Sequence, residues 1–117
     1  MNNAFIETLS SAIDEFAKER DWQQFHSPKN LSMALIVEAA ELVEHFQWLS
    51  ERQSKELDHD RRAAVVEELA DTLIYTLRHA SQMEIDLGGA AWAKLEKNRH
   101  RYPVEKARGT ARKYTEL

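Results

Sequence analysis

The sequence contains no cysteine. Disulfide bonds, thiolate zinc sites and cysteine nucleophiles are therefore excluded. Glycine and proline are scarce, with 3 and 2 residues among 117, and this scarcity favours helices with few interruptions. No apolar run is long enough to span a bilayer. The segment 1–11 has neither the basic start nor the apolar stretch of a signal peptide, so we expect a cytoplasmic protein with no membrane partner.

The chain also lacks an excess of positive charge. Its 20 acidic and 16 basic residues give a net charge of −4, whereas nucleic-acid-binding proteins usually carry a basic excess. We therefore expect no nucleic-acid partner. The length is that of one domain, and we expect a single domain over residues 1–117 with a basic tail at about 104–117. Chains this short bury a modest core, so association of several copies is a common way to bury more surface.

Apolar residues recur at helical spacing, and alternation typical of strands is absent. The pattern predicts an all-α fold with helices at about residues 3–20, 28–49, 58–83 and 86–98. Ser27, Asp58 (or Asp60) and Asp86 are suited to cap the starts of the last three helices. Segments 21–26 and 50–60 are predicted loops. The basic tail after Pro103 is expected to lie along a partner surface or to be partly disordered.

Two pairs of acidic residues lie within largely apolar helical segments, Glu38 with Glu41 and Glu68 with Asp71. A spacing of three residues places both carboxylates of a pair on one helix face. Apolar residues surround the first pair on nearly all sides of its helix, which is typical of a buried helix. A buried carboxylate is costly unless a cation accompanies it. If the two helices pack antiparallel, four carboxylates meet, and Mg²⁺, which prefers oxygen ligands, would relieve their repulsion.

The acid pairs have two alternative interpretations. The acids could form surface salt bridges with Arg61, Arg62 or Arg78, since exposed ion pairs are common. Two pairs on two largely apolar helices make this interpretation less favourable than a metal site. A di-iron helical bundle requires Glu-x-x-His motifs, and the third predicted helix has none, which disfavours that alternative.

The acidic motif, Glu38-x-x-Glu41 followed by Glu68-x-x-Asp71, resembles the metal motif of the all-alpha nucleoside triphosphate pyrophosphohydrolases, the MazG-like group. The similarity extends over nearly the whole chain and is greatest to the dCTP pyrophosphatase branch. The segments that carry it are RDWQQFHSPKNL (20–31), FQWL (46–49), EELADTLIY (67–75), KNRHRYP (97–103) and ARKYTEL (111–117).

The resemblance implies a four-helix protomer that assembles as a homodimer or homotetramer. It implies a Mg²⁺-dependent enzyme that converts a dNTP and water into a dNMP and pyrophosphate, acting on dCTP and 5-substituted dCTP. The implied metal ligands are Glu38, Glu41, Glu68 and Asp71. The implied substrate-binding residues are Trp22, His26 and Trp48 around the base, Tyr75 and Asn98 near the sugar and phosphates, and Lys94 and Arg101 at the triphosphate.

One carboxylate that is not fully used by the metal could orient or deprotonate the attacking water, and we take Glu41 as the candidate. Without the resemblance, Trp22 and Trp48 would more often be core or interface anchors than platforms for a base. The chain departs from the eukaryotic members of the group at Ile13, where those members have a histidine that frames the base. This departure bears on which base the site prefers.

Two rival functions stay open. One is a broad-specificity dNTP pyrophosphatase that cleanses the nucleotide pool. The other is a non-catalytic helical module that keeps the fold and senses nucleotides or drives oligomerisation. The intact set of four acidic residues counts against the non-catalytic module.

Overall fold

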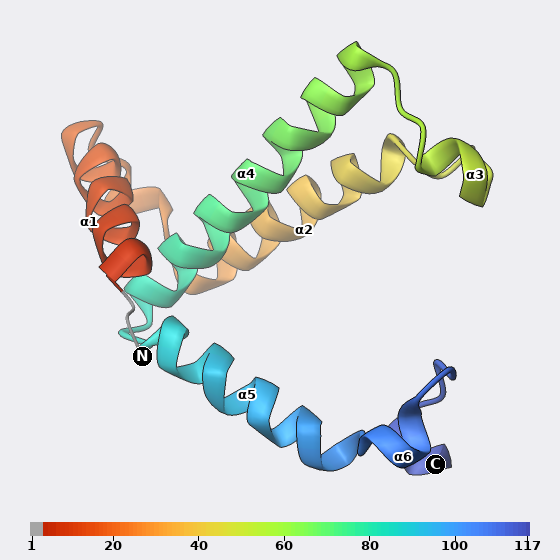
Figure 1. Cartoon of the computed structure of the whole chain (residues 1–117). Coiled ribbons are helices and arrows are strands. Elements are labelled where there is room, and N and C mark those ends of the chain that lie inside the picture. Colours follow the sequence, from red (N-terminus) through yellow and green to blue (C-terminus); the bar gives the residue numbers. More distant parts are fainter. Residues whose placement is uncertain (1–3) are drawn as a thin grey trace. The chain divides into compact units, whose positions relative to one another are not determined.

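The structure is a computed structural model, which describes residues 4–117. Over this range the chain forms helices and turns. Four long helices dominate, namely α1 (Ala4–Glu19), α2 (Pro28–Glu44), α4 (His59–Gln82) and α5 (Leu87–Arg101) (Figure 1). Shorter helical segments are η1 (Trp22–Phe25), α3 (Glu51–Ser54), α6 (Val104–Ala107) and η2 (Tyr114–Glu116). The predicted all-α class is confirmed, although Asn3, the predicted start of the first helix, lies outside the described residues.

Three long helices begin at the capping residues that the sequence predicted. The side chains of Ser27, Asp58 and Asp86 each accept a hydrogen bond from the backbone N–H three residues further on, at 3.1, 2.8 and 3.1 Å. These bonds satisfy N–H groups that have no partner within the helix. The starts of α2, α4 and α5 are therefore determined by local sequence.

Helix α2 is shorter than predicted. It ends at Glu44 rather than near Leu49, and residues 45–48 form turns. The predicted loop 50–60 contains the short helix α3. Ser50 and Gln53 form a reciprocal capping box at its start, a local signal that the prediction missed.

The basic tail is more ordered than predicted. It contains α6 and η2, and the ring of Tyr114 packs edge-on against that of Tyr102, with 5.9 Å between ring centroids. The guanidinium of Arg101 lies 4.6 Å from the centroid of the Tyr114 ring. A cation over an aromatic face is attracted by the ring quadrupole, which helps to hold the end of the chain against α5.

The chain packs as two compact units, residues 1–85 and 86–117. In the first unit α2 lies along α4 and runs in the opposite direction, and α1 also contacts α4 (Figure 1). The second unit consists of α5, α6 and η2. A single domain over residues 1–117 stays a prediction. None of the helices within residues 4–117 combines the length and apolar character that crossing a membrane requires.

The buried core is small, and α2 is covered on one side only. The buried apolar residues are Ile13, Ala17, Leu31, Leu77 and Ala80. Met33, Ile36 and Val43 on α2 remain 55%, 64% and 56% exposed. The prediction that α2 is buried all round is therefore wrong for a single chain, because α4 covers only the face that carries the acidic pair.

Replacing Leu77 by alanine should lower the free energy of unfolding by about 2–5 kcal/mol, because the lost methyl groups leave a cavity that the core fills only partly. Urea denaturation followed by circular dichroism measures this change. Arg62→Ala, at an exposed position of the same helix, is the control and should change the value by less than about 0.5 kcal/mol. A loss below about 1 kcal/mol for Leu77→Ala would contradict its place in the core.

Candidate active site

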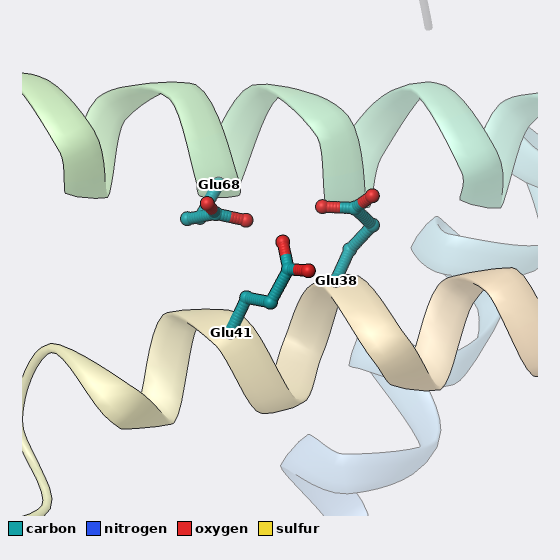
Figure 2. Close-up of side chains that lie close together, drawn as sticks. All are labelled: Glu38, Glu41 and Glu68. Carbon is teal, nitrogen blue, oxygen red and sulfur yellow. The ribbon is translucent and has the colours of Figure 1, made fainter.

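Three carboxyl groups meet between α2 and α4. Figure 2 shows Glu38 and Glu41 reaching from α2 and Glu68 from α4 into the space between the two helices. One oxygen of each residue lies within 4.8 Å of the others, and all three side chains are half-buried. The spacing of three residues places Glu38 and Glu41 on the same face of α2, and the packing of α4 brings Glu68 opposite them.

Burial and mutual repulsion change the protonation of this cluster. Burial raises the pKa of Glu38 to about 7, with further contributions from the neighbouring Glu68 carboxyl and from the charges of Glu41 and Asp71. The pKa of Glu68 is also raised, again with burial as the largest cause. Without a cation, the cluster therefore retains a proton close to neutral pH.

Two oxygen atoms of the cluster are buried without a hydrogen-bond partner among residues 4–117, Oε2 of Glu38 and Oε2 of Glu68. Buried polar atoms in proteins almost always have a partner, so a partner from outside the chain is expected. Hard divalent cations prefer carboxylate oxygens. The residues present therefore fit a divalent metal ion, with Glu38, Glu41 and Glu68 as the group that would hold it.

The surface salt-bridge interpretation of the acid pairs is wrong. None of the ion pairs within the described range involves the four acids. Arg61 donates instead to the backbone carbonyl of His45, at 3.3 Å. Arg78 pairs with Asp14, at 2.8 Å. Among residues 4–117, no positive side chain forms an ion pair with the cluster.

A cavity of about 250 Å³ adjoins the carboxylates, between α1, η1 and α4. Trp22 and His26, two of the residues assigned to the base, line it together with Tyr75. Asp71 also lines this cavity and is not one of the three clustered acids. Its charge nevertheless contributes to the raised pKa of Glu38, so Asp71 connects the cavity with the cluster. The remaining lining residues are Ile13, Phe16, Ala17, Ile74 and Arg78.

An aromatic wall forms one side of the cavity. The Trp22 ring lies edge-on between Phe16 and His26, with ring centroids 5.5 and 6.0 Å away. Asp21, with φ of 55°, turns the chain sharply between α1 and η1 and brings Trp22 back against α1. The tryptophan remains 40% exposed, which leaves ring surface for a ligand.

Four further residues were predicted to bind the substrate. Trp48 follows α2 in the turn region and is 87% exposed, and it does not line the cavity. Lys94, Asn98 and Arg101 lie on α5, in the second unit. Their spacing of four and three residues places them on one face of that helix. Their roles at the substrate stay predictions.

The sequence prediction missed the polar group behind the aromatic wall. Arg78 is only 4% exposed, and it bonds to Asp14 of α1 and to His26. Each of the two charged residues directly follows a core residue in the sequence, Asp14 after Ile13 and Arg78 after Leu77. This adjacency was the only available sign that the two charges are partly or fully buried. The two charges are 64 residues apart, so only the packing of α1 on α4 reveals them as a pair.

Known proteins resemble this chain in sequence and in structure. A family model described as the MazG-like family matches residues 33–117. dCTP pyrophosphatase 1 of Rattus norvegicus is 49% identical over 114 residues, which cover 96% of this chain and 67% of that protein. The Homo sapiens protein of the same name is 48% identical over 114 residues, with the same coverage. The crystal structure of a pyrophosphatase from Archaeoglobus fulgidus aligns with a TM-score of 0.80 and 38% identity, covering 88% of this chain and 96% of that one.

Mg²⁺ should raise the melting temperature more at about pH 8 than at about pH 5.5. Folding raises the pKa of Glu38 from 4.5 to about 7, so the metal-free folded state binds more protons than the unfolded state. Its stability therefore falls as the pH rises through this interval. A bound cation replaces those protons and stabilises the folded state. Thermal denaturation with excess MgCl₂ or with EDTA, at both pH values, measures the difference.

Glu38→Gln provides the informative variant for this measurement. It removes one negative charge, so the metal-free protein should melt at a higher temperature at about pH 8, and the shift caused by Mg²⁺ should shrink. Glu7→Gln, at an exposed position of α1, should change neither value. Equal Mg²⁺ shifts at the two pH values in the wild type would contradict the carboxylate cluster as the binding site.

Proposed function

The chain belongs to the MazG-like family and is a nucleoside triphosphate pyrophosphohydrolase, and we propose that it converts dCTP and 5-substituted dCTP into the dNMP and pyrophosphate, with Mg²⁺ as its metal. One observation carries the proposal. An uncompensated carboxylate cluster adjoins a cavity with an aromatic wall. The carboxylate cluster suits a metal-bound triphosphate, and the aromatic cavity suits a nucleotide base.

Hydrolysis of a phosphoanhydride requires neutralised charge on the phosphates and a water molecule in line with the bond that breaks. Bound Mg²⁺ supplies that neutralisation, and Glu38, Glu41 and Glu68 would hold it, with Asp71 as the proposed fourth acid. Glu41 accepts the proton of the attacking water. The acids thus lie inside the protein because a cation and a triphosphate share the site with them.

The cavity binds the base in this proposal. Trp22 offers an aromatic face, and His26 and Tyr75 offer polar atoms beside it. Lys94 and Arg101 neutralise the triphosphate, and Asn98 contacts the sugar or phosphates. A broad-specificity dNTP pyrophosphatase is the alternative, and comparison of the bases discriminates between the two.

We also propose that the active form is a homodimer or homotetramer. A hollow of about 450 Å³ on α2 is lined mainly by apolar residues, among them Ile36, Ala40 and Val43. Extended apolar surface in contact with water is typical of protein interfaces. Trp48, almost fully exposed in its own chain, closes the base site of another copy in such an assembly.

Incubation with each canonical dNTP and with 5-methyl-dCTP should give dNMP and pyrophosphate only when Mg²⁺ is present, fastest with the cytosine nucleotides. Glu38→Ala should lower kcat by more than about 100-fold, since even residues that only orient metal ligands contribute about 10- to 100-fold. Chromatographic analysis of the products gives the rates, and Glu7→Ala serves as the control. Turnover that survives Glu38→Ala overturns the metal assignment, and a folded wild type that hydrolyses no triphosphate points to the non-catalytic module.

Sedimentation equilibrium should give a mass of about two or four times the 13.6 kDa of one chain. The double variant Ile36→Glu with Val43→Glu should shift the mass towards that of one chain, because each new carboxylate would be buried in the interface. Lys29→Glu, at an exposed position near the start of the same helix, should leave the mass unchanged. A monomeric wild type at the concentration used for the activity assay would rule out the proposed assembly.

A further inference from the structure

Arg78 is a buried cation in the wall of the cavity, and the mechanism above does not use it. Its side chain lines the cavity together with Trp22 and His26, and the residue is 4% exposed. An arginine keeps its charge under all physiological conditions, and a buried charge requires a partner. Asp14 supplies one by accepting a hydrogen bond from Nη1 at 2.8 Å. This ion pair explains why the charge is tolerated there.

The guanidinium of Arg78 is held in one orientation by Asp14, which is itself fixed by a hydrogen bond. Asp14 of α1 uses its second oxygen to accept a hydrogen bond from the hydroxyl of Ser81, on α4, at 2.6 Å. Both carboxylate oxygens of Asp14 are therefore engaged. A guanidinium is planar, with five N–H donors at fixed angles, so the bond to Asp14 also fixes where its other donors lie. The orientation of Arg78 is thus set before a ligand binds.

This orientation determines the protonation of His26. Nε of Arg78 lies 3.0 Å from Nδ1 of His26. A guanidinium only donates, so Nδ1 must be the unprotonated acceptor, and the neutral ring carries its hydrogen on Nε2. Burial, followed by the charge of Arg78, lowers the pKa of His26, which agrees with a neutral ring. Nε2–H forms no hydrogen bond with another residue of the described range, and His26 lines the cavity, so this N–H is available to donate to a ligand there.

Arg78 itself has a donor to spare. Its Nη2 is buried and has no hydrogen-bond partner in the described part of the chain. An unsatisfied buried N–H is unfavourable, and such groups in native proteins usually have a partner outside the chain. The side chains that border the cavity therefore carry two donors without acceptors, Nε2–H of His26 and Nη2–H of Arg78. A ligand that satisfies both presents two acceptors.

We propose that Arg78 determines the base specificity of the cavity, by positioning His26 as a donor and by offering its own Nη2–H to the same base. Cytosine has this complement, because O2 and the unprotonated N3 are adjacent acceptors on its Watson–Crick edge. Uracil and thymine have a hydrogen on N3, which would oppose a donor. A site built to form a hydrogen bond discriminates strongly against an analogue that cannot form it. This inference rests on the proposed function, since it takes a nucleotide as the ligand.

Arg78→Met tests the assignment in the full-length protein. Its KM for dCTP should rise about tenfold or more, and the ratio of kcat/KM for dCTP to that for dUTP should fall about tenfold. Because Arg78 is a positioning and binding residue, kcat should change less than about threefold. Arg78→Lys should also lose the preference, because one ammonium cannot reproduce the guanidinium fork that bonds Asp14 and His26. Arg62→Met, at an exposed position of the same helix, should leave all values unchanged.

Two binding and spectroscopic measurements separate this inference from the proposed function, because neither requires turnover. Calorimetric titration with dCMP and with dUMP, without metal, should show tighter binding of dCMP. Long-range proton–nitrogen NMR near neutral pH should show a neutral His26 with its hydrogen on Nε2, the signals being identified by their loss in His26→Gln. Equal affinity for the two monophosphates, or a His26 protonated on Nδ1, overturns the role of Arg78 even if the enzyme hydrolyses dCTP. An unchanged dCTP-to-dUTP ratio in a folded Arg78→Met does the same.

Discussion

The packing of α2 against α4 brings three carboxyl groups within 4.8 Å of one another, and the rest of the site depends on how their repulsion is relieved. No positive side chain in the described range pairs with them. Without a cation, burial and the neighbouring carboxylates raise the pKa of Glu38 to about 7, which favours retention of a proton by the cluster. A bound cation would also relieve the repulsion, and it would bind the triphosphate at the same place. Repulsion among the carboxylates destabilises the metal-free protein. Binding of metal and substrate removes this repulsion, and its removal favours their binding.

The cluster has an excess of hydrogen-bond acceptors, whereas the cavity has an excess of hydrogen-bond donors. Its polar side chains include two donors, Nη2 of Arg78 and Nε2 of His26, that have no acceptor within the part of the chain that the structure describes. The cluster has two buried carboxylate oxygens that accept no hydrogen bond from residues 4–117. A metal–nucleotide whose base presents acceptors satisfies both ends at once. The unpaired acceptors of the cluster and the unpaired donors of the cavity therefore fit the two ends of the one elongated ligand that we propose.

Because the core of one chain is small, the helix that carries the acidic pair also carries apolar surface suited to an interface between copies. Few apolar side chains are buried within one chain, whereas one face of α2 exposes Met33, Ile36 and Val43. The opposite face of the same helix carries the acidic pair. In the proposed oligomer, burial of the apolar face would hold α2 firmly against α4, and the geometry of the carboxylates would then depend on contacts between copies.

The sequence by itself determined the features that depend on a few neighbouring residues. The helical class and the starts at Ser27, Asp58 and Asp86 follow from hydrophobic spacing and from capping, and both act within one or two turns. The placing of Glu38 and Glu41 on one face follows from helix geometry for the same reason. The similarity to MazG-like proteins was also readable, because its motifs are contiguous segments.

Only the tertiary structure decided which helix faces meet. It placed Asp71 in the wall of the cavity rather than in the carboxylate trio, and it left Trp48 exposed. It also joined Asp14 to Arg78 across 64 residues. Such pairings depend on how whole helices dock, and helix docking is set by the sum of many side-chain contacts. No local pattern in the sequence encodes that sum.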